Sequence, residues 1–260
     1  MAKIVALVNQ KGGVGKTTTS INLAAAFGNS GYRVLLIDLD PQANATSGLG
    51  YKKSEIFPSI YQVLLGHHEL KSSIIETPFI NLDLVPSHPD LTGAEVELIN
   101  VLGREFRLRD MLAELDKVYP YIIIDCPPSL NILTINALAC SNYLIIPLQC
   151  EYFALEGITQ LLGVIKLVNE RLNPRLRIGG ILLTMSDSRT NLSQQVIDEV
   201  KRYFKDKVYK IVVPRNVKLG EAPSFGLPAI YYDSKCTGAI SYIKLAQEIL
   251  NQSYKELLTP

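Results

Sequence analysis

The chain has 260 residues, and its 26 lysines and arginines against 25 aspartates and glutamates give a net charge of +1. That balance excludes a uniformly basic nucleic-acid coat and an acidic disordered tail, although a total can hide a local basic face. Hydrophobic residues make up 47% of the chain and charged residues 20%, so we expect a globular protein with a sizeable core.

Neither a membrane span nor a secreted protein is expected. No run approaches the roughly 18–20 apolar residues that cross a bilayer, and the segment 1–9 turns polar too soon for a signal peptide. The cysteines form no CxxC pair and have no metal-type spacing with the three histidines. We expect reduced, mostly buried thiols in a cytoplasmic protein. The cysteines are Cys126, Cys140, Cys150 and Cys236.

Short apolar runs alternate with segments of helical spacing along most of the chain. The runs that predict strands are 4–8, 34–37, 82–85, 121–124, 143–146, 180–183 and 210–213. Helices are predicted over 17–27, 158–172, 192–204 and 240–250. Runs that are apolar throughout suit strands buried on both faces, so this order predicts an α/β fold with a doubly wound, mostly parallel sheet. The segment 41–118 should add loops and helices at one edge, and we interpret residues 1–260 as a single domain.

The strongest chemical signal is a glycine-rich loop between the first predicted strand and the first predicted helix. It reads QKGGVGKTT from Gln10 to Thr18. Glycines let backbone N–H groups turn towards phosphate oxygens, and the N-terminus of the following helix adds the positive end of its dipole. Lys16 can reach the β- and γ-phosphates, and the hydroxyl of Thr17 can bind Mg²⁺. The loop is a variant of the pattern GxxxxGK[ST], because Gln10 replaces its first glycine and Lys11 is an additional lysine.

Aspartates directly follow two of the predicted strands. Asp38 and Asp40 follow the second strand, and Asp125 follows the fourth. Ligands bind at the carboxyl ends of the strands in open α/β sheets, so these carboxylates should converge near Lys16. A phosphate loop needs such groups to hold the metal ion and to position water.

Several sequence blocks extend these signals along the chain. They are KGGVGKTT at 11–18, DLDPQ at 38–42, DCPPS at 125–129, QCEYFALEG at 149–157, VPRNV at 213–217 and EAPS at 221–224. Together they resemble the ParA/Soj chromosome- and plasmid-partitioning ATPases, within the deviant Walker A, or MinD-type, group. The resemblance covers nearly the whole chain and implies a P-loop NTPase-like fold. It also implies a dimeric cycle of ATP binding and hydrolysis that serves chromosome or plasmid partition.

The resemblance implies three catalytic residues. Lys11 would reach across the dimer to the partner's nucleotide and neutralise developing phosphate charge. Lys16 would hold the β- and γ-phosphates of its own nucleotide, and Asp40 would position or activate the attacking water. Thr18 would bind the α-phosphate, and Glu151 would approach the nucleotide from the partner subunit.

The resemblance also implies the cofactors ATP and Mg²⁺. Mg²⁺ would be held by Thr17, with Asp38 and Asp125 supporting its shell directly or through water, since this ion usually keeps several waters. Pro214 and Asn216 would contact the adenine. The implied nucleotide-binding residues are Lys11, Gly12, Gly13, Val14, Gly15, Lys16, Thr17, Thr18, Glu151, Pro214 and Asn216.

The charge of the chain is unevenly distributed. Residues 166–218 hold twelve lysines and arginines against five aspartates and glutamates, a net charge of +7, so the remainder carries −6. Such a cluster can neutralise DNA phosphates and make binding salt-dependent, although a solvated helix face with unrelated loop charges is the alternative. The DNA-binding candidates are Arg189 and Lys218 from the resemblance, and Lys201, Arg202 and Lys205 from the solvent side of a predicted helix.

The family implies a homodimer when ATP is bound, nonspecific double-stranded DNA and a ParB-like stimulating protein as partners. It implies no membrane and a cytoplasmic, nucleoid-associated location. A MinD-like membrane-positioning ATPase is an alternative, but the segment 251–260 matches its basic amphipathic helix poorly. A metabolic ligase or an iron–sulfur reductase on the same scaffold is another. A reductase would need cysteines that bridge a cluster, whereas we expect Cys126 and Cys150 to pack in the core.

Overall fold

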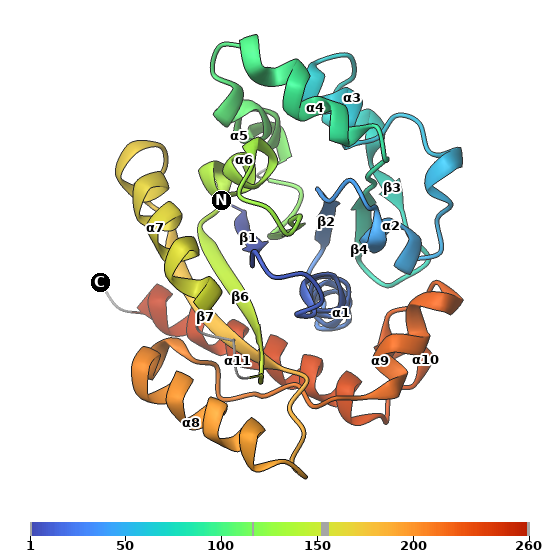
Figure 1. Cartoon of the computed structure of the whole chain (residues 1–260). Helices are drawn as coiled ribbons and strands as arrows, with labels where there is room; N and C mark the ends of the chain where they lie inside the picture. The colour runs from blue at the N-terminus through green and yellow to red at the C-terminus, as the bar shows by residue number, and fades with distance from the viewer. Residues whose placement is uncertain (1, 116, 152–155, 259–260) are drawn as a thin grey trace.

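A seven-stranded sheet forms the centre of the molecule (Figure 1). The structure is a computed structural model that describes residues 2–115, 117–151 and 156–258. Its strands are β1 (Lys3–Leu7), β2 (Val34–Asp38), β3 (Ile75–Glu76), β4 (Leu82–Val85), β5 (Tyr121–Asp125), β6 (Tyr143–Gln149) and β7 (Arg177–Thr184). Their order is β3-β4-β2-β5-β1-β6-β7, and only the β3–β4 pair is antiparallel. The predicted α/β fold with a mostly parallel sheet is therefore confirmed.

Helices cover both faces of this sheet. They are α1 (Lys16–Asn29), α2 (Asn44–Gly48), α3 (Ile60–Leu65), α4 (Leu91–Glu97), α5 (Arg107–Leu112), α6 (Ile132–Cys140), α7 (Glu156–Arg171), α8 (Asn191–Phe204), α9 (Val217–Glu221), α10 (Ala229–Tyr232) and α11 (Thr237–Leu258). The helices α1, α10 and α11 pack on one face, whereas α3 to α8 pack on the other. The fold is therefore doubly wound. Within the segment 41–118, β3 and β4 form one edge of the sheet, whereas α5 packs beside α6, where Asn136 accepts the backbone N–H of Leu108 at 3.1 Å.

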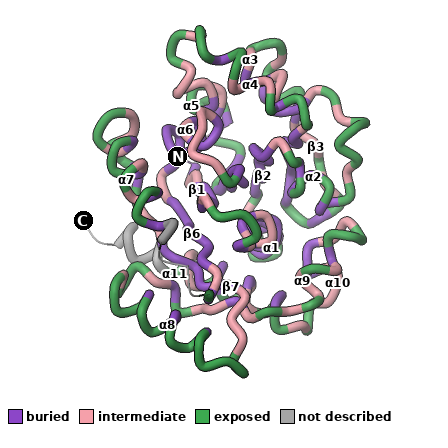
Figure 2. Tube along the Cα trace, viewed as in Figure 1, coloured by how far each residue is buried: buried purple, intermediate pink, exposed green. Residues whose placement is uncertain are grey.

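Alternate residues of the central strands enter opposite cores. In β5, Ile122 and Ile124 join the core under α3 to α8, while Tyr121 and Ile123 join the core under α1 and α11. Burial on both sides requires apolar side chains at every position, which explains the uninterrupted apolar runs. Figure 2 shows this distribution, with buried segments at the central strands and α1 and exposed segments on the outer helices.

One predicted strand is wrong. The run 210–213 lies beside β7 but forms no ladder with it. The isolated bridges are at Val208, to Ile181 of β7, and at Pro214, to Ser186 beyond its end, and the backbone N–H of Val213 donates to Leu183 at 2.9 Å. The reason is a competing acceptor, because the side chain of Glu248 in α11 accepts the backbone N–H groups of Lys210 and Ile211 at 2.9 and 3.2 Å. Those two groups are therefore not available to a sheet ladder.

The buried face of α8 is formed by Val196, Ile197 and Val200, whereas Leu192 near its start is 44% exposed. Lys201 and Arg202 are exposed, in agreement with the prediction. In the described part of the chain, no helix is both long enough and apolar enough to cross a bilayer.

Candidate functional site

The glycine-rich loop joins β1 to α1. Gly13 and Gly15 have φ angles of 74° and 87°, a left-handed conformation that glycine adopts without strain. Gly15 is the N-cap of α1, and no described side chain caps the helix there, so the N–H groups of the first turn can bind an anion. The carbonyl of Val14 accepts a 2.9 Å hydrogen bond from Oγ1 of Thr184, which ties the loop to the end of β7. The loop can thus present backbone N–H donors to a phosphate group.

Lys16 opens α1 with a buried side chain. Its Nζ donates to the carbonyl of Lys11 at 3.2 Å, so the side chain folds back over the loop. Burial lowers the pKa of Lys16, and the nearby charges of Asp125 and Asp40 oppose that effect. An anionic phosphate in the loop would favour the charged ammonium in the same way.

Asp125 ends β5 with a carboxylate that is fully buried. Ser20 in α1 donates to its Oδ1 at 2.8 Å, whereas Oδ2 has no hydrogen-bond partner among the described residues. Burial raises the pKa of Asp125, and the hydroxyls of Thr17 and Ser20 oppose that effect. A buried carboxylate oxygen without a partner, near Thr17 and the phosphate loop, fits a hydrated Mg²⁺ ion, which takes oxygen ligands and keeps several waters.

No all-protein metal cage is found in the described residues, because none of their histidines, cysteines, aspartates and glutamates form a group of three or more that could hold a metal ion. Mg²⁺ needs no such cage, since one or two carboxylates, substrate phosphates and water complete its shell. The residues present, Thr17 and Asp125, therefore fit a magnesium ion that arrives with a nucleotide.

Asp38 ends β2 and lies beside Asp125 in the sheet register. Its oxygens already have partners within the chain. Thr46 donates to Oδ2 through its backbone N and Oγ1 at 2.8 and 2.7 Å, and the backbone N of Asp40 donates to Oδ1 at 3.2 Å. Burial raises the pKa of Asp38, and the charge of Asp125 raises it further. The carboxylate of Asp38 therefore fixes the conformation of the segment 40–46, whereas Oδ2 of Asp125 has no partner among the described residues and can bind a ligand.

Asp40 lies on that ordered segment with a buried side chain. Its Oδ1 accepts the backbone N–H of Gln42 at 2.9 Å, and its carbonyl accepts Oγ of Ser87 at 2.7 Å. Ser87 also donates its backbone N–H to Oγ1 of Thr46 at 2.9 Å. Ser87 and Thr46 could not be recognised from the sequence, because their role depends on β4 ending beside β2. Ser20 was also missed, although its position four residues after Lys16 puts both on one helix face.

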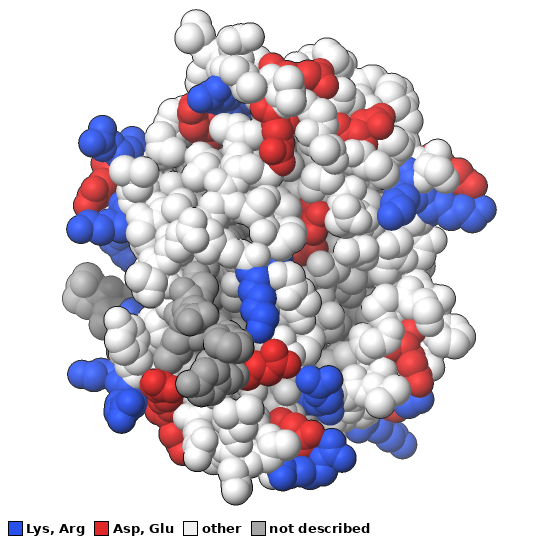
Figure 3. All heavy atoms as spheres, in the orientation of Figure 1, with Lys and Arg blue, Asp and Glu red and all other residues white. Residues whose placement is uncertain are grey.

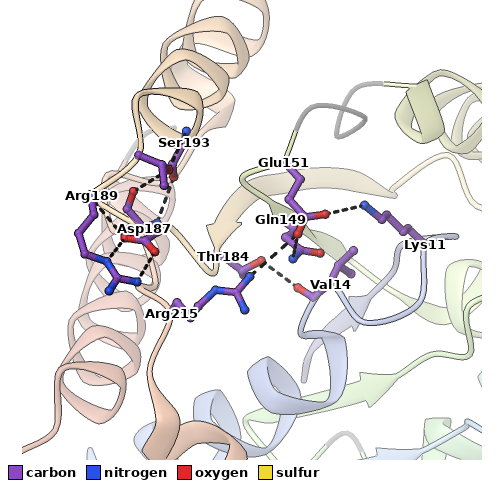
Figure 4. A network of polar contacts seen from close by, with 10 residues as sticks. Lys11, Val14, Gln149, Glu151, Thr184, Asp187, Arg189, Ser193 and Arg215 are labelled. Atoms are coloured by element: carbon purple, nitrogen blue, oxygen red, sulfur yellow. Dashed lines mark hydrogen bonds and ion pairs between the residues drawn. The ribbon is translucent and has the colours of Figure 1, made fainter.

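Lys11 pairs with a carboxylate of its own chain (Figure 4). Its Nζ lies 3.3 Å from Oε2 of Glu151, which follows β6. Glu151 also accepts a 2.5 Å hydrogen bond from Gln149, and Nη2 of Arg215 lies 4.0 Å from its Oε1. The structure thus brings the predicted Lys11 and Glu151 together within one chain. Residues 152–155 of the block 149–157 lie outside the described residues.

The predicted adenine contacts lie just before α9. Pro214 bridges to Ser186 beyond the end of β7. The Oδ1 of Asn216 accepts the backbone N–H of Lys218 at 2.9 Å, and its Nδ2 donates to Thr237 at 2.7 Å, so this side chain caps α9 and joins it to α11. A hollow of about 290 Å³ opens beside the loop. Its lining residues are Thr17, Thr18, Ile21, Asn22, Asn44, Ser47, Gly48, Ala222, Pro223 and Leu227.

The candidate DNA-binding cations lie at separate places on the surface. Arg189 precedes α8, Lys201 and Arg202 occupy its last turn, Lys205 follows it, and Lys218 lies in α9. Figure 3 shows cationic and acidic side chains next to one another along the lower part of its face. The surplus of positive charge in the sequence therefore does not form one continuous basic surface in this view.

The cysteines in the chain have no disulfide partner, and Cys126, Cys140 and Cys150 are buried. Burial raises the pKa of Cys150 to about 11 and that of Cys126 well above its ordinary value. A cluster ligand at a subunit boundary needs an accessible thiolate, so neither cysteine is suited to the iron–sulfur alternative.

Comparison with known proteins agrees with this site. The AAA domain family model matches residues 2–178. The chain is 55% identical over 249 residues to the sporulation initiation inhibitor protein Soj of Bacillus subtilis, covering 96% of this chain and 98% of that protein. It is 54% identical over 252 residues to the chromosome partitioning protein ParA of Myxococcus xanthus, covering 97% and 89%.

A solved structure extends the similarity to three dimensions. It is that of cobyrinic acid a,c-diamide synthase from Mycobacterium smegmatis, with a bound ATP analog and magnesium. The TM-score is 0.87 at 38% sequence identity, with 98% of this chain and 96% of that chain covered. Near-complete coverage by both relatives places the resemblance on the whole chain rather than on the phosphate loop alone. The chain belongs to the ParA/Soj family of partitioning ATPases.

Proposed function

We propose that residues 1–260 act as a single ATP-hydrolysing domain that serves chromosome or plasmid partition as a nucleotide-controlled switch. ATP binding would join two copies, the joined copies would hold DNA without sequence preference, and hydrolysis would separate them. A ParB-like protein would stimulate hydrolysis, and the protein would be associated with the nucleoid. The observation that carries the proposal is the meeting of Lys16, Asp40 and the open oxygen of Asp125 at one glycine-rich loop.

The residues of the loop would bind and orient the triphosphate. Backbone N–H groups of 12–15 would donate to phosphate oxygens, and the ammonium of Lys16 would hold the β- and γ-phosphates. The hydroxyl of Thr17 and the open oxygen of Asp125 would hold Mg²⁺ and its waters. When bound, Mg²⁺ neutralises charge on the phosphates.

Asp40 would orient the attacking water. Its Oδ1 is fixed by the backbone of Gln42, and a fixed carboxylate can accept a hydrogen bond from water and aim its oxygen. Lys11 would leave Glu151 and cross to the nucleotide of the second copy, where a cation stabilises the charge that develops during transfer. Because the Lys11–Glu151 pair is half exposed, breaking it costs little.

The decisive experiment is retention of random-sequence double-stranded DNA with and without ATP. Wild-type protein should form a dimer and retain DNA only with ATP, while Lys16→Ala should do neither. Lys52→Ala is the matched control, since Lys52 is an exposed lysine paired with Glu55 away from the loop. Equal DNA retention by the nucleotide-free protein would contradict the proposal. The MinD-like alternative depends on side chains of 252–260, which lie outside the described part of the chain.

A further inference from the structure

The two cations that the family resemblance assigns to DNA both have carboxylate partners on their own segments. Nε and Nη2 of Arg189 donate to Oδ1 and Oδ2 of Asp187 at 2.9 and 2.6 Å (Figure 4). Nζ of Lys218 lies 2.9 Å from Oε2 of Glu221, one helical turn further along. Each pairing neutralises the charge that a DNA phosphate would otherwise meet.

Asp187 is held in place by the start of α8, whereas Arg189 projects outward. The backbone N–H of Asp187 donates to Ser193 at 3.2 Å, and its carbonyl accepts Oγ1 of Thr190 at 3.1 Å. The backbone N–H of Arg189 donates to Oδ1 of Asp187 at 3.0 Å. The Arg189 side chain is 83% exposed, against 23% for Asp187. A fixed carboxylate therefore holds an otherwise free guanidinium, and their hydrogen bonding keeps the pKa of Asp187 well below its usual range.

Glu221 is held in a comparable way. The hydroxyl of Tyr232 donates to its Oε2 at 3.1 Å, and the ammonium of Lys218 lies 5.4 Å from the centre of the Tyr232 ring. The carboxylate is thus fixed between α9 and α10, so the lysine is held on a prepared acceptor.

The cations at the other end of α8 differ. Among the ion pairs of the described residues, none involves Lys201, Arg202 or Lys205. Ion pairing is therefore selective among the candidate DNA-binding cations. Arg189 and Lys218 each form an ion pair, whereas the three cations at the end of α8 form none among the described residues.

Arg215 lies on the segment next to Asp187, but its cation is directed elsewhere. Its backbone N–H donates to the carbonyl of Ser186 at 2.9 Å, whereas its Nη2 lies 4.0 Å from Oε1 of Glu151 (Figure 4). Its charge contributes to the lowered pKa of Asp187. If Arg189 leaves for a phosphate, the more distant charge of Arg215 still acts on Asp187 and partly compensates for the lost pair.

We propose that Asp187 and Glu221 act as masks that hold Arg189 and Lys218 in ion pairs, so that DNA phosphate binds these cations only by displacing a carboxylate. This inference rests on the proposed DNA-binding function and specifies its regulation. Each displacement lowers the affinity of a single copy for DNA. Two joined copies contribute two sets of cations to one DNA molecule, so their combined affinity overcomes that loss. The masks therefore keep the affinity of a single copy for DNA low, so that retention of DNA requires two joined copies.

The test is fluorescence anisotropy with random-sequence double-stranded DNA, using full-length protein and a nonhydrolysable ATP analogue across a KCl series. Asp187→Asn removes the charge but keeps an oxygen for the backbone N–H of Arg189, and Glu221→Gln is its counterpart. The matched control is Asp198→Asn, because Asp198 is an exposed aspartate of α8 that accepts from Gln194 instead of an arginine. The two mask variants should bind DNA about three- to tenfold more tightly than the control variant, with steeper salt dependence.

A second arm separates release of Arg189 from a general change in charge. In an Arg189→Ala background, Asp187→Asn should raise the affinity for DNA no more than Asp198→Asn does. Equal gains from Asp187→Asn and Asp198→Asn in the native background would overturn the mask, as would weaker binding by Asp187→Asn. If wild-type protein binds DNA and these comparisons fail, only the mask is wrong. If neither wild-type nor variant protein binds DNA, the proposed function and the mask are both wrong.

Discussion

Asp38 and Asp125 occupy paired positions on the adjacent parallel strands β2 and β5, and both side chains are fully buried. Burial is the main cause that raises the pKa of each, and the charge of Asp125 adds to the rise at Asp38. Two neighbouring carboxylates in a buried site do not both ionise readily. A divalent cation at the open oxygen of Asp125 would favour their ionised forms.

This pair predicts an unusual pH dependence for the magnesium-free protein. A carboxyl whose pKa is raised in the folded state binds a proton that the unfolded chain releases, so its contribution to stability is lost as pH rises. For Asp125 the window lies between its ordinary value of 3.8 and about 6. As pH rises through this window, the free energy of unfolding of Asp125→Asn should increase relative to that of wild type by about 1–3 kcal/mol. Urea unfolding in EDTA at pH 4 to 7 measures this, and a constant difference between the two proteins would disprove it.

The hydroxyl of Thr46 is predicted to stabilise the fold, because it is buried, donates to Asp38 and accepts from the backbone N–H of Ser87. Thr46→Val keeps the shape but leaves the backbone N–H of Ser87 without its acceptor, and Oδ2 of Asp38 keeps only the backbone N–H of residue 46, so the substitution should lower the free energy of unfolding by about 1–3 kcal/mol. Ser47→Ala on the same helix is the control, since the hydroxyl of Ser47 bonds back to the carbonyls of Ala43 and Asn44 at the start of that helix. If thermal or urea unfolding showed that the two variants lose similar amounts of stability, the special role of the Thr46 hydroxyl would be contradicted.

Lys11 should matter for turnover and hardly at all for folding. Lys11→Ala breaks only a half-exposed ion pair with Glu151, which contributes at most about 1 kcal/mol to stability. Loss of a cation that acts on developing phosphate charge should lower the ATPase rate by about 10²–10³-fold. Steady-state phosphate release at saturating ATP, with unfolding curves as the control, tests both halves. If the ATPase rate fell only in proportion to the fraction of folded protein, Lys11 would have no catalytic role.

Asp40→Ala should separate ATP binding from hydrolysis. The variant keeps the loop and Lys16, so it should bind ATP, dimerise and remain on DNA while hydrolysis slows by at least about 10²-fold. Size-exclusion chromatography and DNA dissociation rates give the measurement. Asp110→Ala, at an exposed aspartate of α5, should behave like wild type. Normal turnover by Asp40→Ala would show that another group orients the water.

The sequence predicted the central strands and the phosphate loop well, because both depend on local pattern. The apolar run 121–124 needs burial on two faces, and a glycine loop before Lys16 has few other uses. The failures come from tertiary contacts. Nothing near 210–213 indicates that Glu248, almost forty residues later, takes the backbone groups of that run.

The site residues divide in the same way. Asp125 is recognisable because it follows a predicted strand, but its open oxygen depends on where Ser20 points. Arg189 and Lys218 could be named as cations from the sequence. Their partners could also be read as near neighbours, yet only the folded geometry shows that these carboxylates hold them.

The capture of two backbone groups by Glu248 also affects how copies of this chain can associate. At one side of the sheet, the segment 208–214 covers β7, and Glu248 occupies donors of that cover. At the other side the last strand, β3, has two residues and runs against its neighbour. Within the residues that the structure describes, neither margin offers a long open row of donors and acceptors on which another strand could be added. Two copies of the chain are therefore not expected to associate by joining their sheets edge to edge. Their association would depend on contacts between side chains, which can form and break reversibly.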